Sequence, residues 1–488
     1  MPAAPSTIEA DLAVVGAGAA GLYAALTAAD AGGHVALVSA TPLAQSASYW
    51  AQGGLAAALA LDDSPELHLA DTLRAGRGTV RRSAAELLAQ EAPASVRDLE
   101  RLGVRFDADR RGRLALGLEG GHSARRVTHA GGAATGRRVT RQLSALVAEH
   151  ARIDVLEDCR AVAVLTAGER CAGLRLHDRR LVATRGVVLA TGGAAALWSR
   201  TTNPPGTTGA GMLLAHRAGA ALADLEMVQF HPTAVAIDNG ADGFLVTEAI
   251  RGEGALLLDA AGERFVDELA PRDEVARAVA RRMQQSGAPA VMLDMRMVDP
   301  ALFPNVVSVL RGAGIDPARE LVPVAPAAHY VMGGIATDLD GRSTLPGLHA
   351  VGECACTGLH GANRLASNSL SECFVFGRRA ALAALDEPPP APLDAAAAAS
   401  AGGPRPVLDQ ASREALWRDA GIERDAAGLQ RLLGDPNALV RLVGACALAR
   451  EESRGAHQRR DFPQLDPALD DHHTVVRGDA APALERWP

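Results

Sequence analysis

The first forty residues of the chain alternate between short apolar runs and small polar breaks. Residues 12–15 are all apolar, a glycine-rich turn follows, and the apolar residues up to Ala29 are typical of a helix. A second apolar run extends from His34 to Val38. Strand, glycine turn, helix and strand in this order predict a βαβ unit that binds a nucleotide at the start of its helix.

The glycine spacing in this unit matches the Gly-x-Gly-x-x-Gly fingerprint of nucleotide-binding turns. The first glycine permits a tight turn, the second lets the backbone approach a pyrophosphate, and the third lets the helix lie close to the strand. The residues that we expect at the nucleotide are Gly16, Ala17, Gly18, Ala19, Ala20 and Gly21.

Two later apolar runs extend this nucleotide-binding pattern. "RGVVLATGG" reads as a buried strand that ends at Thr191 and Gly192, and "GLHAVGECA" reads as another that ends at Glu353. Ser39 stands where an acid would hold the ribose of NAD, so the pattern disfavours NAD. An N-terminal glycine fingerprint with a late strand ending in Gly-Glu is typical of a two-part FAD domain. We therefore expect an α/β fold with a Rossmann-like, two-part FAD-binding domain.

Changes in composition divide the rest of the chain. A polar segment inserted before the late strand predicts an α+β capping domain. A Pro/Ala-rich stretch predicts a linker, and the helical spacing after it, with Asp, Pro and Gly breaks, predicts a C-terminal helical bundle. The expected units are the FAD-binding domain at residues 1–228 and 329–385, the capping domain at 229–328, the linker at 386–409 and the helical domain at 410–488.

Composition excludes several kinds of chemistry. All 49 basic residues are arginines, so Schiff-base, pyridoxal-phosphate and Walker A chemistry, which need a lysine amine, are excluded. The net charge of −8 disfavours nucleic acid as a partner. The six cysteines lack the spacing of a zinc or redox motif, so we expect no metal. The uncharged run from Leu12 to Ala29 contains clustered glycines and acidic flanks, and we expect a cytoplasmic protein that does not enter a membrane.

Five donor or cationic side chains stand in glycine-rich or proline-rich segments of the later chain. Histidines, hydroxyls and arginines of this kind suit a ligand with two carboxylates, because arginine binds a carboxylate through two parallel hydrogen bonds. Each alone is better explained by a surface charge or a structural hydrogen bond, but five together favour a site. They are His231, Thr247, Arg272, His329 and Arg364.

Longer strings resemble one known family. "AQGGLAAAL", "EGGHSARR", "QFHPT", "TEAIRGEG", "APRDEVARA", "AAHYVMGGI" and "GLHGANRLASNSL" are similar to the flavoprotein subunits of succinate dehydrogenase and fumarate reductase. The resemblance implies that a dicarboxylate is held against FAD and exchanges electrons with it. It is strongest to the branch of the family that oxidises L-aspartate to iminoaspartate.

The resemblance also implies roles for the polar side chains. Arg272 is the proton-transferring residue, and the other four members of the set above bind the carboxylates. Because an ordinary arginine has a pKa above about 12, it transfers a proton only with a partner. Glu248 and Arg251 are the implied relay, and their spacing of three places them on one helix face. A helix-surface ion pair is the alternative for Glu248.

The same resemblance implies which residues hold FAD. The "AQGG" segment approaches the flavin, and a turn before a late helix lies beneath its ring. Family members that bind flavin covalently have a histidine five residues before the glutamine of "AQGG", where this chain has Ala47, so we expect non-covalent FAD. Besides the glycine fingerprint, the expected residues are Ser39, Ser48, Gln52, Gly53, Gly54, Thr191, Gly192, Glu353, Asn368, Ser369 and Leu370.

Glu119 in "LEGGHSARR" indicates the substrate. A carboxylate there suits an ammonium group, which L-aspartate has and succinate lacks, so we expect L-aspartate as the substrate. The resemblance implies O2, which yields H2O2, or fumarate as electron acceptor. It also implies the first step of NAD biosynthesis through quinolinate, with quinolinate synthase as functional partner. Two alternatives stay open: a flavoprotein subunit of a succinate dehydrogenase or fumarate reductase complex, and a flavin-binding protein without turnover.

Overall fold

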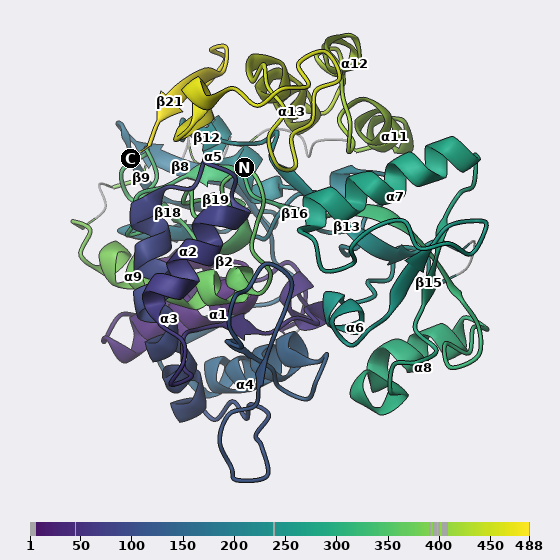
Figure 1. Cartoon of the computed structure of the whole chain (residues 1–488). Coiled ribbons are helices and arrows are strands. Elements are labelled where there is room, and N and C mark those ends of the chain that lie inside the picture. Colours follow the sequence, from purple (N-terminus) through teal and green to yellow (C-terminus); the bar gives the residue numbers. More distant parts are fainter. Residues whose placement is uncertain are drawn as a thin grey trace.

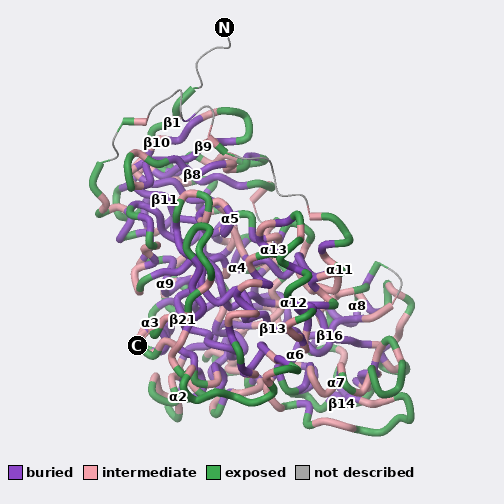
Figure 2. Tube along the Cα trace, turned by 90° about the horizontal axis from the view of Figure 1, so that it is seen from above, coloured by how far each residue is buried: buried purple, intermediate pink, exposed green. Residues whose placement is uncertain are grey.

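The computed structural model describes residues 6–43, 45–237, 240–389, 392–393, 398, 401–402 and 408–487. Figure 1 shows a larger lobe of sheets and helices, drawn from purple to green, and a smaller teal lobe beside it. The C-terminal residues, drawn in olive and yellow, lie across the top of both lobes. Buried chain runs through the middle of the molecule, and exposed chain lies mostly at its edges (Figure 2).

A five-stranded parallel sheet forms the centre of the larger lobe. The pairs along it are all parallel, and four of its strands are buried over their whole length, as parallel strands covered on both faces require. This is the expected Rossmann-like sheet. In spatial order the strands are β18 (Leu348–Ala350), β11 (Gly186–Leu189), β2 (Leu12–Val15), β3 (Val35–Val38) and β7 (Ile153–Leu156).

Helix α1 (Ala19–Asp30) begins just after β2 and packs against α4 (Thr135–Glu149) and α9 (Asn368–Leu385). The ring of Tyr23 in α1 meets Phe374 in α9 edge to face, with ring centroids 5.2 Å apart. The Tyr23 hydroxyl donates a hydrogen bond to Asp98 in α3 (Arg82–Arg101), which packs on α2 (Pro65–Ala75). Helix α9 thereby joins the late part of the chain to the N-terminal βαβ unit.

Smaller elements complete the larger lobe. A four-stranded sheet contains β1 (Thr7–Glu9), β10 (Leu181–Ala183), β9 (Arg170–Leu176) and β8 (Ala161–Ala167). A three-stranded sheet contains β4 (Leu55–Ala56), β6 (Val127–Thr128) and β5 (Leu116–Gly117). The remaining elements are α5 (Ala210–Arg217) and the 3₁₀ turns η1 (Ala47–Trp50), η2 (Ala195–Leu197) and η4 (Gly352–Cys354).

The smaller lobe is built on an antiparallel sheet of β13 (Val228–Val235), β16 (Val322–Val331), β15 (Val291–Asp294) and β14 (Leu256–Leu258). Helix α7 (Arg272–Ser286) packs against β13, β15 and β16. Val246, Val279 and Val306 are among the residues of an apolar core that belongs to this lobe. The lobe also contains α6 (Glu248–Gly252), η3 (Pro300–Leu302) and α8 (Pro304–Gly312).

The C-terminal part combines helices with strands. Helices α11 (Gln410–Asp419), α12 (Ala426–Leu432) and α13 (Ala438–Ala449) each begin after an Asp or Asn side chain that accepts a backbone N–H. After the 3₁₀ turn η5 (Pro467–Leu469), β20 (His472–Val476) and β21 (Ala483–Arg486) join β12 (Leu222–Ala223), β17 (Gly334–Ala336) and β19 (Ala355–Cys356) in one sheet.

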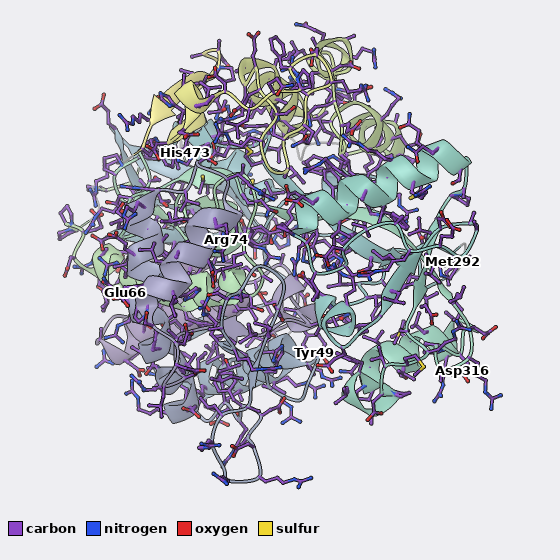
Figure 3. All side chains as sticks on the ribbon, in the orientation of Figure 1. Tyr49, Glu66, Arg74, Met292, Asp316 and His473 are labelled. Carbon is purple, nitrogen blue, oxygen red and sulfur yellow. The ribbon has the colours of Figure 1, made fainter. Side chains whose placement is uncertain are left out.

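The helical bundle expected at residues 410–488 therefore comprises residues 410–449, and the later residues add strands. His473, labelled in Figure 3, belongs to β20 of this sheet. The β-branched run of Thr474, Val475 and Val476 favours a strand over a helix. Much of the linker expected at 386–409 lies outside the described residues. No helix in the described ranges has both the length and the apolar composition needed to cross a bilayer.

A buried ion network fastens the C-terminal part to the larger lobe. Arg450 Nε donates to Glu226 Oε1 and Arg450 Nη1 donates to Glu452 Oε1, each at 2.9 Å. Arg454 Nε donates to the same Glu452 oxygen at 2.8 Å, and the Thr474 hydroxyl donates to Glu226 Oε1 at 2.7 Å. The four charged side chains are at most 1% exposed. Loss of one partner would leave a buried charge uncompensated.

We predict that Arg450→Met lowers the free energy of unfolding by about 3 to 5 kcal/mol, because Glu226 and Glu452 both lose a cation. Urea unfolding curves of the FAD-loaded protein measure the change.

Arg486→Met is the matched control. Arg486 lies 3.2 Å from Asp471, with side chains 69% and 40% exposed, and exposed pairs contribute at most about 1 kcal/mol. Equal losses from the two substitutions would contradict the buried-network argument.

Candidate active site

The polar residues indicated by the sequence come together where the smaller lobe meets the larger one. Side chains fill the space between the ribbons of the two lobes (Figure 3). Tyr49 of η1 lies at the edge of the larger lobe that faces the smaller lobe. Gln52 Nε2 of the larger lobe donates to the Leu245 carbonyl oxygen of the smaller lobe at 2.9 Å. Smaller-lobe elements carry His231, Thr247, Glu248, Arg251, Arg272 and His329, and the larger lobe supplies Glu119 and Arg364.

Two arginines from different lobes share one amide oxygen. Gln229 Oε1 accepts from Arg272 Nη1 at 3.1 Å and from both Arg364 Nε and Arg364 Nη2 at 3.3 Å. The amide nitrogen of Gln229 donates to Asn363 Oδ1 and to the Arg364 carbonyl oxygen, each at 2.9 Å. Burial, with the nearby charge of Arg272, lowers the pKa of Arg364 to about 10. Two buried cations around a neutral amide form a strong site for an anion.

The Arg364 guanidinium is held in one plane by its surroundings. It lies over the Tyr330 ring, 4.4 Å from the centroid, and Nη1 donates to Ser369 Oγ at 2.5 Å. The Tyr330 hydroxyl donates to Glu372 Oε2 at 3.1 Å, which fixes the ring. Such an oriented, planar guanidinium suits bidentate contact with a carboxylate.

Arg272, Glu248 and Arg251 form a charged chain at the starts of α6 and α7. Arg272 Nε lies 2.5 Å from Glu248 Oε2, and Arg251 Nη2 lies 3.7 Å from the same oxygen. Burial alone would raise the pKa of Glu248, but the charges of Arg272 and Arg251 outweigh it and lower that pKa. Glu248 is therefore a buried, ionised carboxylate shared by two arginines, which differs from the helix-surface ion pair left open by the sequence.

The two histidines face each other across the β13–β16 strand pair, with ring centroids 5.2 Å apart. The Thr233 N–H donates to His231 Nδ1 at 3.3 Å, so His231 Nε2 carries the proton and is the donor of the ring. His329 Nδ1 lies 2.7 Å from the Thr202 hydroxyl. Burial and neighbouring arginines hold the pKa of both histidines well below its usual value. Both are therefore neutral hydrogen-bonding groups, and buried Thr247 lies at the start of α6 beside Glu248.

Glu119 lies in the same interior and is ionised. Ser367 Oγ donates to Glu119 Oε2 at 2.6 Å, and His129 Nε2 lies 3.4 Å from Glu119 Oε1. Burial alone would raise the pKa of Glu119, but contact with His129 and Ser367 and the charge of Arg272 lower it to about 2. Glu119 is thus a buried carboxylate near the arginines, and only 6% of its surface is exposed.

The segment that carries Glu119 is anchored by a buried arginine. Arg126 donates to Asp63 through Nε and Nη2 at 2.9 and 2.8 Å, and to Asp71 through Nη1 at 2.5 Å. His122 Nε2 lies 2.9 Å from the Ala366 carbonyl oxygen, next to Ser367. The loop containing Glu119 and the turn containing Ser367 are therefore held against each other.

The glycine turn after β2 has the close backbone contacts that a pyrophosphate site requires. Gly16 has a φ of +112°, and a Cβ there would lie 2.2 Å from the Ala190 carbonyl oxygen. A Cβ at Gly21 would lie 1.9 Å from the Gly16 carbonyl oxygen, so α1 approaches the strand as expected. The Ala19 N–H donates to Ser48 Oγ at 3.1 Å and ties the segment before "AQGG" to the start of α1.

Buried polar atoms without a protein partner in the described chain lie near this turn and near the end of β11. They include Ser46 Oγ, Gln52 Oε1 and Thr191 Oγ1. Gly192 has a φ of +74°, in the left-handed region, and a Cβ there would meet no group of the described chain within 4 Å. Because buried polar groups are normally paired, hydroxyl and phosphate groups of a nucleotide suit these atoms. The residues present therefore fit FAD.

Other expected cofactor residues have protein partners as well. Glu353 Oε1 accepts the Val331 N–H at 3.1 Å, and burial raises the pKa of Glu353 to about 7. The Asn368 amide bonds with His68 at 2.8 Å and Thr72 at 3.1 Å, and Ser39 Oγ donates to the Thr41 carbonyl oxygen at 2.5 Å.

Three further members of the expected cofactor set are defined by their packing. A Cβ at Gly54 would lie 2.2 Å from the Thr128 carbonyl oxygen, whereas one at Gly53 would lie 3.3 Å from Ser367 Oγ. Leu370 belongs to the apolar core of the larger lobe. Gly54 thus permits close strand packing, and Gly53 adjoins the Glu119 site.

Three site residues were missed by sequence reasoning: Gln229, His129 and Ser367. Gln229 stands two positions before His231 inside the recognised string "QFHPT", and that spacing was the available signal. Ser367 lies inside the recognised string "GLHGANRLASNSL", directly before Asn368, so the same kind of signal was available for it. His129 carried no comparable signal, because it meets Glu119 only in the folded chain.

The family described as FAD binding domain matches residues 11–370, and the one described as Fumarate reductase flavoprotein C-term matches residues 437–487. The chain is 48% identical to L-aspartate oxidase of Caulobacter vibrioides, over 93% of this chain and 94% of that protein. It is 42% identical to L-aspartate oxidase of Streptomyces coelicolor, over 98% of this chain and 93% of that protein.

Solved structures of similar shape include E. coli quinol fumarate reductase FrdA, with a TM-score of 0.86, 28% identity and coverage of 98% of this chain and 96% of that one. Mycobacterium smegmatis Sdh1 has a TM-score of 0.85 and 31% identity, over 99% of this chain and 95% of that one. The cofactor of this protein is FAD. The chain belongs to the L-aspartate oxidase family, within the flavoproteins related to succinate dehydrogenase and fumarate reductase.

Proposed function

We propose that this protein oxidises L-aspartate to iminoaspartate with non-covalently bound FAD. The observation that carries the proposal is the buried, ionised carboxylate of Glu119 in the same interior as two arginines that share Gln229. A ligand with two carboxylates and one ammonium group complements this charge pattern. Ala47 stands at the position where covalent members of the family have a histidine, which supports non-covalent FAD.

Arg364, His231, His329 and Thr247 bind the two substrate carboxylates in this proposal. Arg364 supplies the fixed charge, because its plane is set by Tyr330, Gln229 and Ser369. The histidines supply neutral N–H donors, since their pKa values lie well below the usual value. Glu119 accepts a hydrogen bond from the substrate ammonium group, which succinate cannot provide.

Oxidation of the amine breaks the Cα–H bond, forms the C=N bond and releases protons. Arg272 passes a proton only when Glu248 takes another from Nε, and the 2.5 Å separation of Nε and Oε2 suits that exchange. Arg251 stabilises the ionised form of Glu248 between transfers. These three residues are the proposed proton path.

FAD supplies the two-electron chemistry when bound, taking electrons from the substrate and passing them to O2, which becomes H2O2, or to fumarate. We place the reaction in the cytoplasm, as the first step of NAD biosynthesis. Iminoaspartate then goes to quinolinate, with quinolinate synthase as the functional partner.

Anaerobic addition of L-aspartate to the FAD-reconstituted protein tests the proposal directly. We expect loss of the visible flavin absorption with L-aspartate and none with succinate. Bleaching by succinate alone would instead support a succinate dehydrogenase or fumarate reductase subunit. Bleaching by neither would support a flavin-binding protein without this activity.

We predict that Glu119→Gln lowers kcat/KM for L-aspartate by about tenfold to hundredfold, because the proposed charge-assisted hydrogen bond to the ammonium group is lost. The inhibition constant of succinate should fall or stay constant in the same variant. Steady-state kinetics with succinate as a competitive inhibitor measure both values. Parallel losses for the two ligands would contradict ammonium recognition by Glu119.

We also predict that Glu248→Gln lowers kcat by at least about a hundredfold, because an amide cannot take the Arg272 proton. KM should change by less than about threefold, since the amide oxygen still accepts from Arg272 Nε. Steady-state rates of L-aspartate oxidation measure this split. A large KM change at constant kcat would assign Glu248 to binding instead.

A further inference from the structure

Glu119 shares its charge with a second titratable side chain. His129 Nε2 lies 3.4 Å from Glu119 Oε1, while the other carboxylate oxygen accepts the Ser367 hydroxyl at 2.6 Å. The side chains of His129 and Glu119 are 20% and 3% exposed. Water therefore screens this pair weakly, and the protonation state of His129 changes the charge that Glu119 presents to a ligand.

We propose that His129 sets how strongly the site distinguishes a dicarboxylate with an ammonium group from one without it, by compensating or releasing the charge of Glu119. This inference rests on the proposed function, because it takes Glu119 as the ammonium partner. His129 is a positioning residue in this role, since it acts on the substrate through Glu119.

The surroundings of His129 favour its charged form. The carboxylates of Glu119 and Asp107 and the Val127 carbonyl are the groups that favour the cation. Burial alone would lower the pKa of His129, but these groups outweigh it and raise that pKa. The His129 ring also packs closely on the backbone of Gly117 in β5. A Cβ added at Gly117 would lie only 3.0 Å from His129 Cε1.

The direction of the pH effect follows from these charges. Below its pKa, His129 is a cation that compensates Glu119, so a substrate ammonium group gains little from the carboxylate. Above that pKa, His129 is neutral and Glu119 keeps a full negative charge. That charge attracts the ammonium group of L-aspartate and repels succinate, which has two carboxylates and no cation. Discrimination therefore rises as the pH passes through the pKa of His129.

The other histidines near the site have pKa values shifted the opposite way. Burial, with neighbouring arginines, holds the pKa of His231 and His329 well below its usual value, and burial also lowers that of His122. L-Aspartate and succinate share two carboxylates. Contacts to those carboxylates contribute similarly to the binding free energy of both ligands, so their contributions largely cancel in the ratio that measures discrimination.

The test compares L-aspartate and succinate on the FAD-loaded protein between about pH 5.5 and pH 8.5, the range of histidine titration. Discrimination is the product of kcat/KM for L-aspartate and the inhibition constant of succinate. We expect the wild type to gain about fivefold across this range, as a weakly screened ion pair allows.

Two substitutions should shift discrimination in opposite directions. His129→Asn removes the titrating charge and should give high discrimination already at low pH, without the wild-type rise. His129→Arg fixes a positive charge and should keep discrimination low at every pH. Flavin content and thermal midpoint of each variant report whether it folds, and either one alone tests the direction of the effect.

His150→Asn is the matched control. His150 also lies beside a carboxylate, 3.3 Å from Asp30, and its side chain is 24% exposed, close to the value for His129. It should keep the wild-type pH profile. A fivefold rise that persists in His129→Asn, or that persists in His129→Arg, would overturn the inference.

The experiment also separates this inference from the proposed function. Oxidation of L-aspartate with a discrimination that does not change with pH overturns the role of His129 alone. No oxidation of L-aspartate at any pH overturns the proposed function, and the role of His129 with it.

Discussion

Repulsion between buried arginines governs the arrangement of this site. Arg272 and Arg364 come from different lobes and both bond to one neutral amide oxygen, that of Gln229. The lowered pKa of Arg364, caused by burial and by the charge of Arg272, reflects that repulsion. A buried cation pair of this kind persists where the surrounding protein fixes it and supplies opposite charge, as Glu248 does for Arg272. The contact between the two lobes therefore brings these two cations together.

The two carboxylates of the site remain ionised for different reasons. Glu248 is held by two arginines, which are permanent charges, so its charge is committed to the chain of Arg272 and Arg251. Glu119 is held by a hydroxyl and a histidine, so its partners are neutral or titratable. The charge of Glu248 is thus compensated at every pH, whereas the compensation of Glu119 depends on a titratable histidine. Burial alone would have raised the pKa of both carboxyl groups.

Local patterns were sufficient to predict the nucleotide-binding half of the fold. The apolar runs at 12–15 and 186–189 are buried parallel strands, and the glycine turn has the expected close contacts at Gly16 and Gly21. Long-range pairing was not predictable in this way. Strand β20 pairs with β12, which lies far earlier in the chain. Ser367 adopts a left-handed φ of +60°, a conformation that a sequence normally signals with a glycine, and this position is not a glycine. The partners of Glu119 depend on such pairings, so the residue could be predicted while its environment could not.

The attachment of the C-terminal strands also affects how the chain folds. Arg450 bonds to Glu226, 224 residues earlier, and His473 bonds to Asp224, 249 residues earlier. Closing loops of this length costs conformational entropy, so we expect these bonds to form late in folding. During synthesis the parallel strands β2 and β3 can pair long before β12 meets β20. Until β20 has been synthesised, β12 therefore has an unpaired edge, and an unpaired strand edge in a nascent chain is prone to aggregation.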